Sequence, residues 1–150
     1  MAGRFVYNLV HFVWSTHERR EWIAESWEDE LYAYIGGIAR NKTATLLQAG
    51  GMPDHLHALV SLPPTMSISE LVSALKANSS RWIHEEKPKL KVFKWQGGYG
   101  AFSVSRSSED VVASYIRGQK AHHRKRDFRS KFLDLLARHD LDYDPQYIWK

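Results

Sequence analysis

The stretch GGMPDHLHALVSL, residues 50–62, decides the fold of this chain. Its first five residues have the composition of a turn, and residues 55–62 form an apolar, β-prone run that ends at the double proline 63–64. Residues 43–49, before the turn, are β-prone as well. The segment therefore predicts a β-hairpin whose second strand begins at His55.

Further elements are expected on both sides of this hairpin. The periodicity predicts a strand at 4–14 before the hairpin and a strand around 101–105 after it. It also predicts a helix at about 21–40 and a second helix that begins at a capping box, 67–70, and ends at Pro88. Two more helices are expected, one that begins at 107–110 and carries Tyr115 and Gln119, and a last one near 130–139. The order β-α-β-β-α-β-α predicts one α+β domain over residues 1–150. In it, helices pack on one face of a ferredoxin-like antiparallel sheet.

The composition excludes several classes of protein. The chain has no cysteine, which rules out thiolate metal sites, redox dithiols and disulfides. No apolar run approaches the roughly 18 residues of a membrane span. Residues 1–14 lack the cleavage pattern of a signal peptide and alternate like a strand. We therefore expect a cytoplasmic protein.

The positive charge is concentrated in one short stretch. Residues 117–131 hold seven Lys or Arg against one Asp, whereas the rest of the chain carries 14 basic and 16 acidic residues. Clustered cations favour a polyanionic partner such as nucleic acid, although such a run can also be a solvated helix face. The residues expected to bind DNA are Arg117, Lys120, Arg124, Lys125 and Arg126.

Two histidines in the second hairpin strand are spaced for joint action. His55 and His57 are two residues apart, so both imidazoles point to one face of the strand, with Leu56 and Ala58 on the other. Two neutral imidazoles on one rigid strand make half a metal site. The alternative is a solvated face with two polar residues.

A tyrosine and a glutamine are paired near the basic stretch. Tyr115 and Gln119 are four residues apart, which places both side chains on one face of a helix. The phenol and the amide could therefore converge on one point. The alternative is that Tyr115 is a core or rim residue of an amphipathic helix.

The order and spacing of the motifs identify a family resemblance. Motifs are VWST at 13–16, MPDHLH at 52–57, LK at 75–76, SSR at 79–81, WQGGYGAFSVS at 95–105 and YIxxQ at 115–119. Together they resemble the HUH single-tyrosine transposases, the TnpA-type enzymes of the smallest bacterial insertion sequences. Relatives of these enzymes are associated with repetitive extragenic palindromes, and the resemblance covers nearly the whole chain.

The resemblance implies a function for each motif. Tyr115 is expected to be the nucleophile, and His55, His57 and Gln119 the ligands of Mg²⁺ or Mn²⁺. The implied activity is cleavage and rejoining of single-stranded DNA at hairpin-marked ends through a 5′-phosphotyrosine. The resemblance also implies a homodimer in which each active site combines the histidines of one subunit with the tyrosine helix of the other.

Some alternatives stay open. A related HUH nicking enzyme, a domesticated palindrome-binding protein and a non-catalytic nucleic-acid-binding module would share much of this pattern. Trp82, Trp95 and Tyr99 are candidates for stacking on unpaired bases, although Trp82 has the spacing of a core residue. No general base is assigned. Asp54 is left out, because alternation along a strand would point it away from the face of His55.

Overall fold

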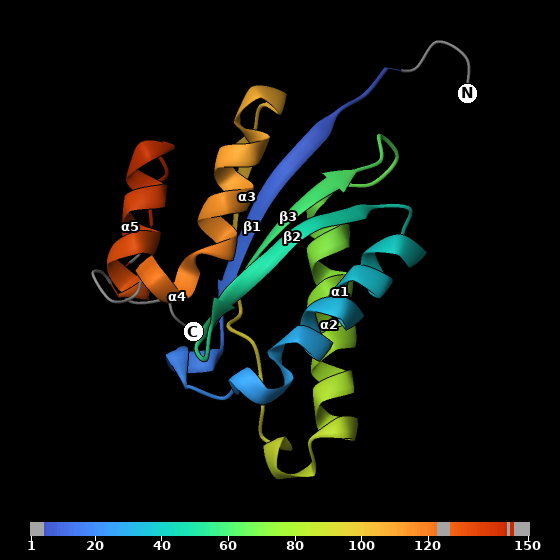
Figure 1. The fold of residues 1–150 in the computed structure, drawn as a ribbon, viewed down its shortest axis with the longest axis vertical. Helices are drawn as coiled ribbons and strands as arrows, with labels where there is room; N and C mark the ends of the chain where they lie inside the picture. Colours follow the sequence, from blue (N-terminus) through green and yellow to red (C-terminus); the bar gives the residue numbers. More distant parts are fainter. Residues whose placement is uncertain (1–4, 123–126, 144, 146–150) are drawn as a thin grey trace.

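A four-stranded antiparallel sheet forms the centre of the computed structural model, which describes residues 5–122, 127–143 and 145. The strand order is β2-β3-β1-β4 (Figure 1). The bounds are β1 (Asn8–Ser15), β2 (Thr45–Met52), β3 (His55–Leu62) and β4 (Gly100–Val104). The expected α+β fold with a ferredoxin-like sheet is confirmed.

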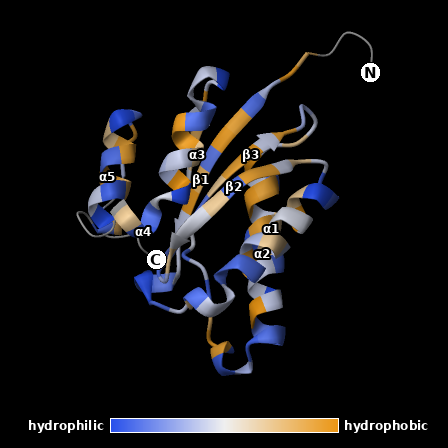
Figure 2. Ribbon diagram, in the orientation of Figure 1, coloured by the Kyte–Doolittle hydropathy of each residue, from blue (hydrophilic) through white to orange (hydrophobic). Residues whose placement is uncertain are grey.

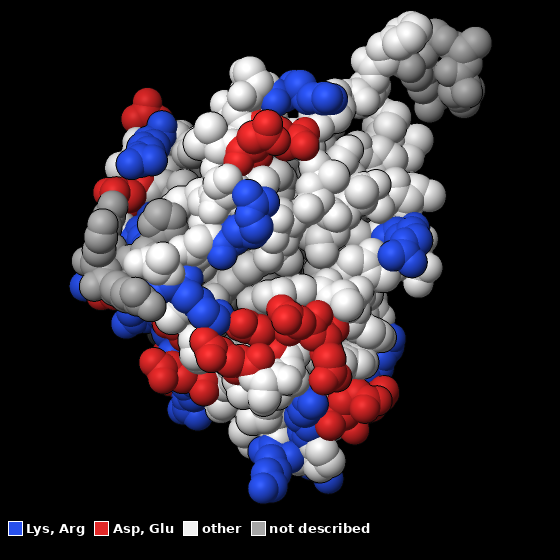
Figure 3. Space-filling model, viewed as in Figure 1, with Lys and Arg blue, Asp and Glu red and all other residues white. Residues whose placement is uncertain are grey.

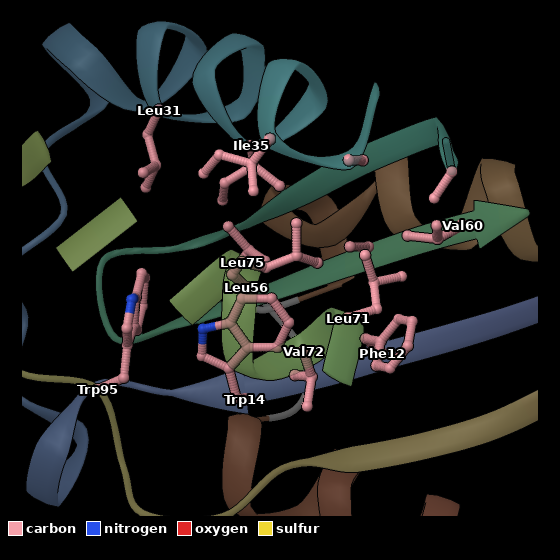
Figure 4. Packing of buried hydrophobic residues seen from close by; sticks show 14 of the residues in the cluster. Phe12, Trp14, Leu31, Ile35, Leu56, Val60, Leu71, Val72, Leu75 and Trp95 are labelled. Atoms are coloured by element: carbon pink, nitrogen blue, oxygen red, sulfur yellow. The ribbon is translucent and has the colours of Figure 1, made fainter. Parts of the chain in front are cut away.

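Helices α1 (Glu25–Asn41) and α2 (Ile68–Glu86) cover one face of this sheet. Alternate residues of the central strands point into this layer, among them Phe12 and Trp14 of β1 and Leu56 of β3 (Figure 4). Leu31 and Leu75 meet them from the two helices, and all five side chains are fully buried. Each large apolar side chain buried in this way contributes roughly 1.5–3 kcal/mol. This layer is the main hydrophobic core.

A second helical layer lies on the opposite face. It consists of α3 (Glu109–Arg117), α4 (Gln119–His122) and α5 (Phe128–Arg138). Leu9 and Leu59 of the sheet pack against Ile116, while Val13 packs against Phe132. The expectation that helices pack on one face of the sheet holds for α1 and α2 but not for α3 to α5. The second layer follows from the strands themselves, because consecutive residues of β1 and β3 are buried and therefore point to both faces. Figure 2 shows that both strands are largely hydrophobic.

The hairpin turn is shorter than the composition suggests. The turn was expected at residues 50–54, but β2 continues to Met52, and Gly50 pairs with His57 across the ladder. Two glycines do not end the strand here, because the ladder with β3 supplies their hydrogen-bond partners. Only residues 53 and 54 form the turn.

The remaining helical elements follow their local signals. The Ser67 hydroxyl accepts a hydrogen bond from the Glu70 amide at 3.1 Å, which confirms the expected cap of α2. Asp127 caps α5 in the same way, through the Ser130 amide at 2.9 Å. Three short 3₁₀ turns complete the described chain, at His17–Arg19, Pro88–Leu90 and Arg106–Ser108. Within the described residues, no helix has the length and hydrophobicity needed to cross a membrane.

Candidate active site

His55 and His57 lie side by side on β3, facing the second helical layer. Both residues are completely buried, and their ring centroids are 5.1 Å apart. β3 is an inner strand, paired with β2 on one side and β1 on the other, so the backbone that carries the two imidazoles is held on both edges. The expected common direction of the two rings is present, and the alternative of a solvated face does not apply.

Each of these histidines is oriented by an outer partner. Oδ1 of Asp54 lies 2.8 Å from Nδ1 of His55, and Nε2 of His11 lies 2.9 Å from Nδ1 of His57. The expectation that Asp54 points away from His55 was wrong. Asp54 belongs to the turn rather than to β3, so the alternation of a strand does not extend to it. Partners at Nδ1 leave Nε2 as the nitrogen that would bind an ion.

His11 is a neutral residue within this cluster. It is 4% exposed, and burial lowers its pKa to about 4, with a smaller contribution from His139. A neutral imidazole has one acceptor nitrogen, and the Nε2 of His11 can accept the proton of His57 Nδ1. The sequence pattern shows His11 only as one position in an alternating strand, so its role could not be predicted from spacing.

Tyr115 reaches the histidine cluster from α3. Its ring centroid is 5.7 Å from that of His57 and 6.2 Å from that of His11, in edge-on arrangements. The helix can come this close because Gly50 lies below it. A Cβ atom at Gly50 would be 2.3 Å from the carbonyl oxygen of Ile116. The absence of a side chain at Gly50 therefore allows the short distance between α3, which carries Tyr115, and the sheet.

Gln119 joins the same cluster from a different helix than expected. α3 ends at Arg117, Gly118 interrupts it, and Gln119 begins α4. Gln119 Nε2 still donates to the carbonyl of Tyr115 at 3.1 Å, and its Oε1 lies 3.4 Å from Nε2 of His55. Tyr115 and Gln119 therefore converge as predicted, although Gly118 separates the two helices that carry them. The helix ends early because a glycine has a low helix propensity.

The donor set is suited to a divalent metal ion. Two imidazole nitrogens, which are borderline ligands, and one amide oxygen, which is a hard ligand, would leave coordination positions for substrate or water. A group of three or more His, Cys, Asp and Glu residues able to hold a metal is absent from residues 5–122, 127–143 and 145. Among the described residues, the Gln119 amide is the third group that lies within reach of this place. Asp54 and His11 supply the outer contacts that such ligands usually have.

The predicted DNA-binding residues are found in different environments. Arg117 is exposed and contacts Gln48 Oε1 at 3.2 Å. Lys120 forms an ion pair with Glu28 at 2.9 Å and donates to the carbonyl of Gly51 at 3.1 Å. Arg124, Lys125 and Arg126 lie outside the described residues.

The aromatic residues also differ in their surroundings. Trp95 is 6% exposed and donates to the Ser79 hydroxyl, so it is a core residue. Trp82 stacks on Tyr34 at 5.2 Å. Tyr99 is partly exposed. Phe128, the first residue of α5, was not predicted from the sequence; its ring stacks on His55 with centroids 4.0 Å apart.

The site lies inside a segment that matches a known family. The family model for IS200-like transposases matches residues 5–119, which include the sheet, the histidine pair, Tyr115 and Gln119. The chain belongs to the IS200-like transposase family. This IS200-like transposase is 30% identical over 121 residues to the ISDra2 transposase TnpA of Deinococcus radiodurans, covering 77% of this chain and 86% of that protein. The transposase of insertion sequence element IS200 from Salmonella typhimurium is 30% identical over 119 residues, which cover 73% of this chain and 74% of that protein.

Solved structures agree with this assignment. The crystal structure of a Deinococcus radiodurans transposase superposes on this IS200-like transposase with a TM-score of 0.67 and 26% identity, covering 77% of this chain and 93% of that one. The structure of a REP-associated tyrosine transposase bound to a REP hairpin shares the fold, with a TM-score of 0.56 and 16% identity. The match covers 77% of this chain and 70% of that one. The resemblance to single-tyrosine transposases is therefore confirmed.

Proposed function

We propose that this transposase cuts and rejoins single-stranded DNA at hairpin-marked ends, with Tyr115 as the nucleophile. One arrangement carries the proposal. The ring centroids of Tyr115 and His57 are 5.7 Å apart in an edge-on arrangement, and Oε1 of Gln119 lies 3.4 Å from Nε2 of His55. A nucleophile beside a set of metal ligands is what transfer of a phosphodiester requires.

The proposed reaction conserves the energy of the phosphodiester bond. The phenolic oxygen of Tyr115 attacks the phosphorus, the bond to the 3′ oxygen breaks, and a 3′-hydroxyl leaves. The DNA end remains attached as a 5′-phosphotyrosine. Attack by a 3′-hydroxyl on that phosphorus reverses the step and joins two strands, so no nucleotide cofactor is needed. The phenol loses one proton during attack and the leaving 3′ oxygen gains one, so the step consumes no net proton.

The histidine cluster supports this reaction electrostatically. His55, His57 and Gln119 would hold Mg²⁺ or Mn²⁺, and such an ion, when bound, neutralises charge on the phosphoryl oxygens. The residues of the chain provide the orientation. The Asp54 carboxylate accepts the Nδ1 proton of His55. His11 would accept the Nδ1 proton of His57 in the tautomer that a bound ion requires. Both contacts direct Nε2 into the site before substrate arrives.

A hairpin-bearing single strand is the proposed partner. The solved REP-associated relative binds a REP hairpin, and the basic stretch 117–131 is suited to a phosphate backbone. The proposed working unit is a homodimer with active sites shared between subunits, as the resemblance implies. Within one chain, the histidines and Tyr115 are already adjacent, so a shared site would exchange equivalent helices between subunits.

Cleavage of a labelled single strand tests this function. The substrate is the hairpin-bearing DNA that flanks the gene, incubated with the protein and Mg²⁺ or Mn²⁺. We expect cleavage that a chelator abolishes, and loss of cleavage in His55→Ala and in His57→Ala. His84→Ala is the matched control, because His84 contacts the carbonyl of Phe93 rather than the cluster. Cleavage by the parent protein in the presence of chelator would contradict the metal assignment.

A further inference from the structure

A cavity of about 680 Å³ lies between α3 and α5, beside the candidate active site. Its floor consists of His11 and residues 102–105, and Tyr115 stands on its α3 wall. The volume falls within the range of roughly 300–1,000 Å³ that is typical of sites for small ligands. The cavity and the histidine cluster share His11 and Tyr115, so anything that fills the cavity lies next to the tyrosine ring.

The cavity lies on the side of the cluster where Tyr115 is partly exposed. His55, His57 and Gln119 are at most 1% exposed, and the ring of Phe128 covers His55. Tyr115 is partly exposed, and it lines the cavity. A DNA strand that brings a phosphate to Tyr115 therefore passes the mouth of this cavity.

Charge disfavours a route over α1. Figure 3 shows acidic side chains gathered over this helix. Glu25, Asp29 and Glu30 are exposed, whereas Glu28 pairs with Lys120 at 2.9 Å. The exposed carboxylates repel phosphates, so a bound strand avoids this surface.

The lining of the cavity has the chemistry of a nucleobase site. The rings of Phe102 and His139 lie 4.5 Å apart on one side, and Val112 and Leu135 add apolar surface. Unpaired bases stack on such surfaces without regard to sequence. Arg138 lies at the same wall of α5 and provides donors for the edge of a base.

A buried lysine completes the lining. Lys131 is 5% exposed and lines the cavity from α5. A phosphate of the same nucleotide would favour the protonated form of this amine. Apolar walls, a donor for the edge of a base and a lysine are thus combined within one cavity, next to the proposed nucleophile.

We propose that this cavity binds one unpaired nucleotide of the DNA strand, adjacent to the phosphate that Tyr115 attacks, with its base between Val112 of α3 and Leu135 of α5. The inference rests on the proposed function, because it takes the position of the scissile phosphate from the role of Tyr115. It adds a contact that holds the strand in line for attack. The occupant is a nucleotide with a base, so a strand that lacks this one base loses the contact.

Fluorescence of 2-aminopurine tests base insertion without requiring cleavage. A series of hairpin-bearing single strands carries the probe at one position at a time along the flank, and binding is measured in the presence of a chelator. We expect strong quenching or enhancement at one position and little change at its neighbours. An abasic site at that position should weaken binding about tenfold, as expected for the loss of one stacked base. A uniform response at every position would overturn the proposal.

A cavity-filling variant tests where the base lies. Leu135→Trp places an indole in the cavity, and Ala137→Trp, on an exposed position of the same helix, is the control. We expect Leu135→Trp to bind the intact strand as weakly as the parent binds the abasic strand, with no further loss when both changes are combined. Ala137→Trp should match the parent. Independent, additive losses would place the base elsewhere and overturn the proposal.

These measurements separate the two claims. If the probe responds at one position and Leu135→Trp removes the response, the cavity binds a nucleotide, whether or not the strand is cleaved. If the parent cleaves but neither the probe nor the variant has an effect, the proposed function stands and the nucleotide site does not.

Discussion

Nε2 of His11 lies 2.9 Å from Nδ1 of His57, and both side chains are buried. This contact joins two inner strands of the sheet, because His11 is on β1 and His57 is on β3. With the proton on Nδ1 of His57 and His11 accepting it, the lone pair of His57 Nε2 would be directed to an ion. The contact therefore engages Nδ1 of His57 and leaves Nε2 as the nitrogen for the site.

Removal of the His11 imidazole should weaken metal binding. We expect His11→Leu to lose about 10- to 100-fold in Mn²⁺ affinity and in cleavage rate, as is typical for outer contacts of metal-binding histidines. His11→Gln keeps an acceptor and should recover part of this loss. Mn²⁺ binding measured by electron paramagnetic resonance, with His84→Leu as the control, checks the prediction. Equal Mn²⁺ affinity in His11→Leu and the parent would show that the contact does not orient His57.

A methyl group at Gly50 should displace the tyrosine helix. The Cβ atom of alanine would lie 2.3 Å from the carbonyl of Ile116, so α3 must lift from the sheet. We expect a loss of about 1–3 kcal/mol in the free energy of unfolding. A displacement of about 1 Å at Tyr115 should reduce cleavage by about 100-fold.

The control for this variant is a glycine on the other side of the molecule. Gly37→Ala, in α1, meets no atom within 4 Å and should stabilise the protein by up to about 1 kcal/mol. Denaturant unfolding and cleavage assays on both variants check the prediction. Parent-like stability and cleavage in Gly50→Ala would mean that α3 does not pack on the sheet at Gly50.

The sequence predicted the sheet, its helices and the common direction of His55 and His57, because these depend on local periodicity. It did not predict the contacts of His11 and Phe128, since each joins segments far apart in the chain. The error on Asp54 arose from extending the strand rule into a turn. Gly118 similarly separates Gln119 from α3, although the two side chains still reach one cluster.

Loss of charge from the basic stretch should change the salt dependence of DNA binding. Each phosphate contact that is removed should reduce the slope of log K against log salt by about 0.7 for a single strand. We expect a flatter slope and weaker binding when Arg124, Lys125 and Arg126 are replaced by alanine. Replacing Lys87, Lys89 and Lys91 removes the same charge from another surface and is the control. Identical slopes for both triple variants would contradict a specific role of the basic stretch.

A mixture of two inactive variants tests whether active sites are shared between subunits. Tyr115→Phe and His57→Ala should each be inactive alone. If a site combines histidines and tyrosine from different chains, a mixed dimer has one intact site and cleavage returns. Differently tagged subunits verify that exchange has occurred. Continued inactivity after confirmed exchange would rule out shared sites and indicate that each chain uses its own Tyr115.

The covalent protein–DNA adduct tests the central claim most directly. The parent protein is incubated with a labelled hairpin-bearing strand and the divalent metal, and the adduct is separated on a denaturing gel and mapped by peptide mass spectrometry. Tyr99→Phe, at an exposed tyrosine, is the matched control. We predict that the DNA is attached at residue 115, and that Tyr115→Phe forms no adduct while its hairpin binding stays close to that of the parent. An adduct that persists in Tyr115→Phe would assign the nucleophile to another residue and contradict this account.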